Sequence, residues 1–210
     1  MKRSGYTLVI CVLLLMGATL QAQFLPQPFS ADFSASTTSH TGDLTGKFFF
    51  SLPSSRMDMS AQGRQMSMIM DGSKQVNYML MHAQKMYMEI RAGQFNPMAR
   101  NLPQVEHSFD SKNPCASSLH SDSTCKDLGP DTRNGRACEK WQLTQKNGHT
   151  TTMWVDQKLH FPIRSENSDG SVFEFSNIKE GAQPASLFDI PAGYKKFDMA
   201  NMQGGGRPPL

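Results

Sequence analysis

Methionine thioethers are the side chains of this sequence whose spacing indicates chemistry. Methionine recurs at every second residue in Met57–Met59, Met66–Met70, Met79–Met81 and Met86–Met88, with Phe48-Phe-Phe50 just upstream. Thioether side chains are flexible and polarizable, so they adapt to apolar partners of variable shape. They are also soft ligands that select Cu(I). The pattern favours the binding of an apolar ligand, and a Cu(I)-handling protein is the alternative.

Sequence motifs of known enzyme classes are missing. The chain has no Gly-x-Ser-x-Gly, no His-Glu-x-x-His, no phosphate-binding glycine-rich loop and no dinucleotide fingerprint. Its acidic residues are scattered, so no pair of carboxylates stands out for acid–base catalysis. We therefore predict that the protein is not an enzyme, has no catalytic residues and needs neither a cofactor nor a structural metal.

Three cysteines beyond the N-terminal region indicate a disulfide. Asn134-Gly135 predicts a hairpin turn whose register keeps Cys125 and Cys138 from being cross-strand neighbours. We therefore expect a Cys115–Cys125 disulfide, with Cys138 left as a free thiol. A zinc site built from the cysteines and His120 is the alternative, but their spacing matches no zinc motif.

The N-terminus has the organisation of a secretory signal peptide. Basic Lys2 and Arg3 precede the apolar run Leu8–Leu15, which is too short to span a bilayer, and Ala22 offers a cleavage site. Removal of residues 1–22 leaves 188 residues (210 minus 22), beginning at Gln23. We expect a periplasmic or secreted protein.

The charge balance argues against a nucleic-acid partner. The formal charge of +3 includes two positive charges of the signal peptide, so the mature chain carries +1. We expect no nucleic-acid binding. The expected partners are an apolar small molecule, a lipid or a lipoprotein, with peripheral contact to the cell envelope possible.

Alternating apolar and polar residues predict short antiparallel strands joined by tight turns. We expect strands at residues 29–37, 47–52, 56–61, 64–70, 75–82, 85–90, 137–145, 149–155, 162–167 and 172–178. Asp71-Gly72, Asn147-Gly148 and Asp169-Gly170 are typical hairpin turns. The predicted fold is mainly β, a curved antiparallel sheet or half-open barrel with little helix. Residues 23–198 form a single domain in this prediction, and residues 199–210 form a disordered tail.

The period of two places the methionines on one side of this sheet, because successive side chains of a strand point to opposite faces. This face is the candidate ligand-binding site, and its predicted residues are Phe48, Phe50, Met57, Met59, Met66, Met68, Met70, Met79, Met81, Met86 and Met88. A closed core under the same residues, in a structural envelope module without a ligand, is the third possibility.

Several other residues are expected to serve the fold. Trp141 and Trp154 are predicted to pack in the core or at its edge. Asp156 is predicted to accept hydrogen bonds from its own turn. Arg164 is predicted to be an ordinary solvated charge on the outer face.

The C-terminal half resembles a known family. Asn134–Arg136, Lys140-Trp141, Met153–Asp156, Leu159–Arg164, Glu174–Ile178 and Ser186–Tyr194 follow one another at close spacing. This order, over about residues 130 to 196, resembles a family of exported, functionally uncharacterised bacterial proteins. It is similar, more distantly, to periplasmic lipoprotein carriers with a half-barrel fold. The resemblance implies a lipoprotein-carrier-like half-barrel and an apolar ligand. The long N-terminal helix of those carriers has no counterpart before residue 29.

Overall fold

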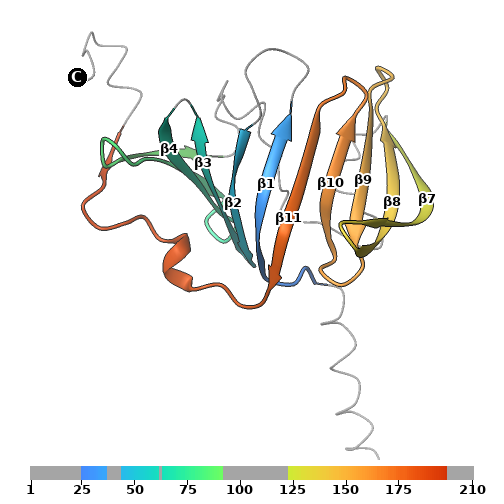
Figure 1. Ribbon diagram of the computed structural model, residues 1–210. Helices are drawn as coiled ribbons and strands as arrows, with labels where there is room; N and C mark the ends of the chain where they lie inside the picture. The colour runs from blue at the N-terminus through green and yellow to red at the C-terminus, as the bar shows by residue number, and fades with distance from the viewer. Residues whose placement is uncertain (1–24, 37–43, 62, 92–122, 198–210) are drawn as a thin grey trace, which may run out of the picture.

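A computed structural model describes residues 25–36, 44–61, 63–91 and 123–197. They form one twelve-stranded sheet with the order β12-β6-β5-β4-β3-β2-β1-β11-β10-β9-β8-β7 (Figure 1). The predicted class, a mainly β curved antiparallel sheet with little helix, is confirmed. Within the described ranges, no helix is long and apolar enough to cross a membrane.

The strands agree with the predicted ones to within three residues at each end, and two further strands are present. Their bounds are β1 Phe29–Ser36, β2 Leu44–Ser51, β3 Ser54–Ala61, β4 Arg64–Asp71, β5 Val76–Met81, β6 Met86–Arg91, β7 Thr124–Arg133, β8 Arg136–Thr144, β9 Thr150–Asp156, β10 Phe161–Asn167, β11 Val172–Glu180 and β12 Lys195–Lys196. A short 3-10 helix, η4, spans Ala185–Phe188.

Tight turns set the register of the hairpins. Asn134 and Gly135 have φ of 50° and 74°, and this left-handed backbone is what a two-residue hairpin loop requires. Their turn joins β7 to β8, and Asp131 lies opposite Cys138. Cys125 lies opposite Leu143, beyond a bulge at Asp127/Gly129 that shifts the register, so Cys125 and Cys138 are not cross-strand neighbours, as predicted.

One long-range pairing unites the two halves of the sheet. β1 lies between β2 and β11, so the first strand of the described chain bridges the methionine-rich hairpins and the C-terminal hairpins. Consecutive hairpins account for most of the other neighbours. Local sequence patterns predict hairpins well, but they carry no signal for the pairing of β1 with β11.

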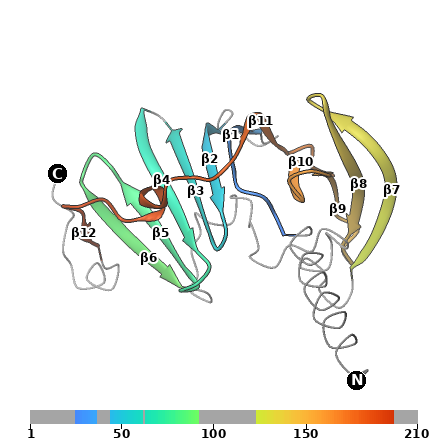
Figure 2. The same cartoon turned by 90° about the horizontal axis from the view of Figure 1, so that it is seen from below.

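The sheet curves strongly, as the view from below shows (Figure 2). Phe50 of β2 and Phe161 of β10 have ring centroids 4.8 Å apart. Their strands are three positions apart, which corresponds to about 14 Å in a flat sheet. The phenylalanine side is therefore the inside of the curve. Because register places the methionines on the same side as Phe48, they too face inward.

The chain after β11 crosses the opposite, outer face of the methionine hairpins. It passes through η4, which contacts β3 and β4, and ends with β12 paired in parallel to β6 (Figure 2). Arg56, which alternates with the inward-facing Met57, donates a 2.9 Å hydrogen bond to the Leu187 carbonyl oxygen. We call residues 181–197 the C-terminal strap.

Two predictions about the C-terminal half are wrong. β7 was not predicted as a strand, because it is polar, largely exposed and interrupted by Gly129-Pro130. Arg164 is not an ordinary solvated charge. Its side chain is 20% exposed, pairs with Glu166 and Glu174, and lies 5.7 Å from the centre of the Trp154 ring.

Candidate functional site

The nine predicted methionines lie on one face in continuous cross-strand rows. We call this surface the methionine face; it consists of Met57, Met59, Met66, Met68, Met70, Met79, Met81, Met86 and Met88. The central row is Phe48–Met57–Met68–Met79–Met88, and each member is the direct partner of the next across β2 to β6. Directly paired residues project to the same side of a sheet. The predicted common face is therefore confirmed.

A second row runs parallel to the first, near the β3–β4 and β5–β6 turns. It is Gly46–Met59–Met66–Met81–Met86, again with each residue paired to the next. We call its four methionines the rim row. The third row, on the other side of the central one, is Phe50–Ser55–Met70–Asn77–Ile90, so polar side chains interrupt it.

Burial differs between the rows. In the central row, Met57 is 2% exposed, and Met68 and Met79 are each 6% exposed. All four rim-row methionines and Met88 are partly exposed. The centre of the methionine face is therefore packed, while its rim presents thioether and methyl groups that a ligand can reach.

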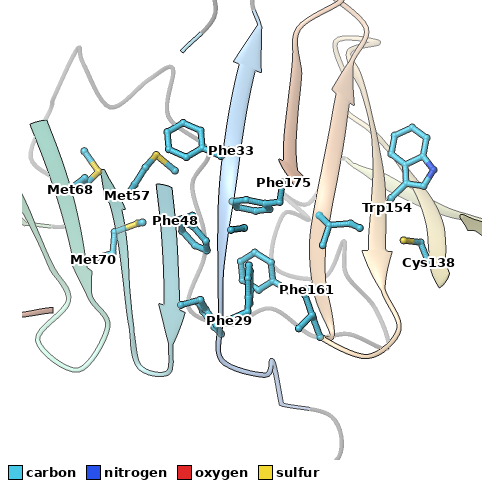
Figure 3. Close-up of a cluster of buried hydrophobic side chains, with 14 of the residues drawn as sticks. Phe29, Phe33, Phe48, Met57, Met68, Met70, Cys138, Trp154, Phe161 and Phe175 are labelled. Carbon is cyan, nitrogen blue, oxygen red and sulfur yellow. The ribbon is translucent and has the colours of Figure 1, made fainter. Parts of the chain in front are cut away.

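Phenylalanine rings fill the bend of the sheet beside the methionine face (Figure 3). Phe48 and Phe175 have ring centroids 4.7 Å apart, and Phe29 lies 5.2 Å from Phe161. Phe48 and Phe50 are 0% and 5% exposed. These two predicted site residues share the face with the methionines, and they are packed within the protein's own aromatic cluster.

Gly46 occupies the one place in the rim row where a side chain does not fit. A Cβ atom there would lie 1.9 Å from the Asp58 carbonyl oxygen and 2.7 Å from the Phe33 ring. Phe33 is the direct cross-strand partner of Gly46, so its ring covers the glycine. The aromatic cluster can therefore extend to the start of the rim row.

The outer face behind the methionines carries a hydrogen-bonded chain that sequence reasoning missed. Ser67 Oγ lies 2.5 Å from an Asp58 carboxylate oxygen and 2.6 Å from His82 Nε2, and His82 Nδ1 lies 2.6 Å from the Tyr194 hydroxyl. Ser67 is only 1% exposed, so its hydroxyl is not presented to a substrate. The chain holds the C-terminal strap on the sheet.

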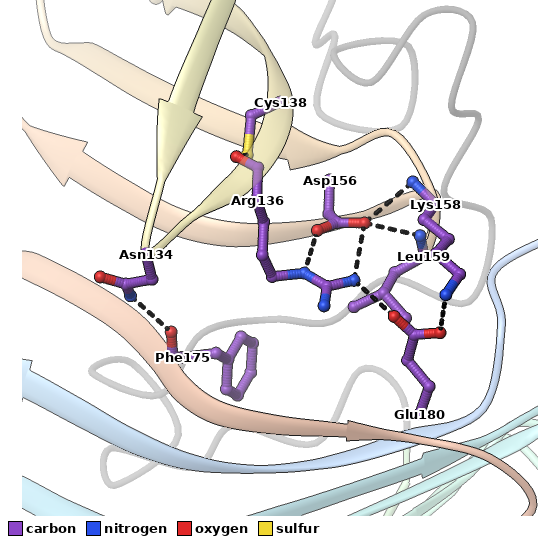
Figure 4. Close-up of polar contacts among 8 residues, drawn as sticks. All are labelled: Asn134, Arg136, Cys138, Asp156, Lys158, Leu159, Phe175 and Glu180. Carbon is purple, nitrogen blue, oxygen red and sulfur yellow. Dashed lines mark hydrogen bonds and ion pairs between the residues drawn. The ribbon is translucent and has the colours of Figure 1, made fainter.

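A second polar network closes the C-terminal half (Figure 4). Arg136 of β8 donates to the buried Asp156 carboxylate and, at 2.9 Å, to Glu180 of β11. The Asp156 partner raises the pKa of the Arg136 guanidinium. Asp156 also accepts from the backbone amides of Lys158 and Leu159, at 2.9 and 2.7 Å, which confirms its predicted turn role.

The tryptophans divide between core and surface. Trp154 is 1% exposed, and its indole N–H donates to Asp131 at 2.7 Å, which lowers the pKa of that carboxyl group. Arg133 and Lys140 lie 4.4 and 4.8 Å from the centre of the Trp154 ring. Trp141 is partly exposed. Trp154 thus has the predicted packing role.

Of the cysteines, Cys138 is a free thiol with 0% exposure. Burial, with the nearby Asp156 carboxylate, raises the pKa of this thiol to about 11. The expected Cys115–Cys125 disulfide remains a prediction, because Cys115 lies outside the described residues. The predicted signal peptide, His120 and the predicted C-terminal tail lie outside them as well.

The described residues at the candidate site are therefore suited to binding rather than to a reaction. The methionine face supplies apolar contact and soft thioether sulfur. The described part of the chain holds no group of three or more His, Cys, Asp or Glu side chains arranged to bind a metal ion. The outer polar chain and the Arg136 network join parts of the fold, and neither lies on the methionine face.

Comparison with protein families gives a match over residues 29–160 to a domain of unknown function, DUF4412. The match spans more than half of the chain and includes the methionine face. The chain belongs to this family. No curated protein matches it in sequence. The predicted resemblance to an uncharacterised family, based on about residues 130 to 196, overlaps the C-terminal end of this match.

Solved structures share the fold at low sequence identity. An uncharacterized conserved protein from Thermus thermophilus is 9% identical over 82% of this chain and 91% of its own, with a TM-score of 0.55. MucB, in the MucA/MucB complex of Pseudomonas aeruginosa, is 18% identical with a TM-score of 0.52. The match covers 80% of this chain and 56% of MucB, so the chain corresponds to little more than half of that protein.

A LolA superfamily protein from Nitrosomonas europaea is also similar, with 12% identity over 80% of this chain and 92% of its own, at a TM-score of 0.39. At these identities the comparisons describe the fold and leave the ligand to be inferred from the site.

Proposed function

We propose that this protein is an exported binding protein that holds a lipid, a lipidated partner or another apolar molecule on the methionine face. The observation that carries the proposal is the pair of unbroken methionine rows across β3 to β6, one buried except at Met88 and one partly exposed throughout. A face that served only as core would have no need for its outermost row to be both apolar and accessible.

The choice of methionine supports a ligand of variable shape. Its unbranched thioether can repack around different apolar groups, whereas leucine or valine would fix one surface. Affinity would come from burial of apolar area, at about 25 cal/mol per Å² before the costs of association. The packed central row would be the floor of the site, and the rim row would make first contact.

The expected compartment agrees with this role. The N-terminal sequence favours export, and a carrier in the cell envelope would meet lipids and lipidated proteins there. MucB, which is similar in fold, has been solved in complex with MucA. This similarity supports a protein as a further kind of partner for the methionine face. The predicted absence of catalytic activity stays a part of the proposal.

The test places charge on the accessible part of the face. Met81 and Met86 are direct cross-strand partners and both are partly exposed. We expect the Met81→Glu/Met86→Glu variant to fold, because water can hydrate the new carboxylates, and to lose binding of a fluorescent fatty-acid analogue. Circular dichroism would report folding, and fluorescence titration would report binding.

Two comparison variants make the result specific. Leu52→Glu/Leu128→Glu adds the same charge at leucines that are 43% and 39% exposed, and it should bind the probe like wild type. Met68→Glu/Met79→Glu places charges at the 6% exposed centre and should unfold the domain. A folded Met81/Met86 variant with wild-type binding would refute the proposal. A wild-type protein that binds no probe would favour the structural envelope module.

A further inference from the structure

The rim row combines three properties that the rest of the methionine face does not share. Its thioethers are adjacent across strands, they are partly exposed, and polar side chains do not interrupt them. The central row is buried except for Met88, and Ser55 and Asn77 break the third row. Only the rim row therefore offers several sulfur atoms to an ion that arrives from solvent.

Register brings three of these thioethers together. Met66 of β4 is the direct partner of Met59 on one side and of Met81 on the other. Paired residues of antiparallel strands have Cα atoms about 4.5–5.5 Å apart. A methionine side chain has three rotatable bonds before its methyl group, so sulfur atoms from three neighbouring strands can converge above the central residue.

The ends of the rim row limit the site to these three residues. At one end Gly46 has no side chain, and the Phe33 ring covers it. At the other end Met86 is paired with Lys195 of β12, whose ammonium group discourages a cation beside it. Met59, Met66 and Met81 lie between these two ends.

We propose that Met59, Met66 and Met81 form a three-thioether site for Cu(I). Thioether sulfur is a soft ligand that favours Cu(I) over hard cations such as Mg²⁺ and Ca²⁺. The exposed cations near the row, Arg64 and Lys195, strengthen this selectivity, because they repel a divalent ion more than the monovalent Cu(I). The site shares its residues with the rim of the proposed lipid-binding face, and it differs from that function in requiring sulfur rather than apolar area.

Leucine substitution tests the need for sulfur. Leucine keeps the apolar character and nearly the volume of methionine but has no sulfur, and such swaps are well tolerated. The rim variant is Met59→Leu/Met66→Leu/Met81→Leu. The matched control changes the buried residues of the central row on the same strands, as Met57→Leu/Met68→Leu/Met79→Leu. Every protein also carries Cys138→Ala, which removes the free thiol as a competing ligand.

The measurement is retention of Cu(I) by the purified full chain against a chromogenic Cu(I) chelator, under ascorbate and without oxygen. We expect wild type and the central-row variant to retain Cu(I) equally and the rim variant to lose it. None of the three should retain Zn²⁺. Retention by the rim variant, or no retention by wild type, would overturn the proposal. Binding of the fatty-acid analogue by wild type is measured in a separate titration, so that a failure of lipid binding is distinguished from a failure of Cu(I) binding.

Discussion

At the scale of single residues, Gly46 is a position where the sheet leaves no room for a side chain. The Cβ atom of Gly46→Ala would fall 1.9 Å from a backbone oxygen of the neighbouring strand, which cannot move without distorting the ladder. The Phe33 ring blocks the alternative direction. We expect a loss of about 3 kcal/mol in the free energy of unfolding, measured by denaturant titration.

Gly148→Ala is the comparison for this prediction. Gly148 has a φ of 82°, and no atom lies within 4 Å of the position that a Cβ would take, so alanine there meets only backbone strain. Its expected cost is about 1 kcal/mol. Equal losses at the two glycines would mean that the close approach of Phe33 and β3 does not determine the need for glycine at position 46.

Sequence patterns predicted residue orientation well where alternation is strict. The nine methionines share a face because a period of two leaves no other arrangement on strands. Arg164 could not be predicted in the same way. Its burial depends on Glu174 from β11 and on the ring of Trp154 from β9, and neither contact leaves a local signal at position 164.

At the scale of elements, the β4–β5 turn depends on the charge of Asp71. Lys74 Nζ lies 2.7 Å from one carboxylate oxygen, and the Ser73 hydroxyl and the Lys74 amide donate to the other. The Lys74 side chain, more than any other group, lowers the pKa of Asp71 from 3.8 to about 2. The charged carboxylate therefore stabilises the folded state.

The lowered pKa fixes the direction of the pH dependence. The stabilisation, about 2 kcal/mol at most, is fully present above pH 4 and is lost as the pH falls towards 2. Asp71→Asn should reduce the decline in unfolding free energy between pH 5 and pH 2. Lys74→Gln should have a similar effect, because it removes the main partner. A wild-type pH profile in either variant would contradict this role for the turn.

The C-terminal strap depends on its hydrogen bonds to the outer face. Tyr194→Phe removes the hydroxyl that contacts His82 Nδ1 and keeps the ring. We expect a loss of about 1 kcal/mol in unfolding free energy and faster amide hydrogen exchange at Lys195 and Phe197, whose amides donate to the carbonyl oxygens of Lys85 and Tyr87. Tyr87→Phe, which removes a hydroxyl from the outer face of β6, is the control. Unchanged exchange in Tyr194→Phe would show that this hydrogen bond does not hold the strap.

The hairpins were predictable element by element, whereas their joining was not. Asn-Gly and Asp-Gly turns and alternating strands identify each hairpin from fewer than twenty residues. The pairing of β1 with β11 joins residues about 140 positions apart in the sequence. It decides that the methionine hairpins and the C-terminal hairpins share one curved sheet, and therefore which side is concave.

At the scale of the whole molecule, both ends of the described sheet are poor templates for further strands. β12 has two residues, both lysine. β7 carries Pro130, which lacks an amide hydrogen, and a bulge at Asp127/Gly129. Charges, proline, bulges and short strands are the devices that discourage edge-to-edge pairing. A partner is therefore more easily accommodated on the concave face than at an edge, which agrees with the proposed site.

The state of the cysteines tests the fold and the compartment together. The buried Cys138 thiol, with its pKa raised to about 11, should resist alkylation by iodoacetamide at pH 8 in the folded protein and react once the protein is unfolded. Protein exported by its own host should start at Gln23 and therefore lack Cys11. In that protein Cys115 and Cys125 should react only after reduction, because we expect them to be joined in a disulfide. Closing this short segment stabilises the fold by on the order of 2–3 kcal/mol. Mass spectrometry of peptides from native, unfolded and reduced samples would separate these steps. Labelling of Cys138 in the native protein would mean that the region where β7, β8 and β9 meet opens readily. A Cys125–Cys138 disulfide would contradict the β7–β8 register.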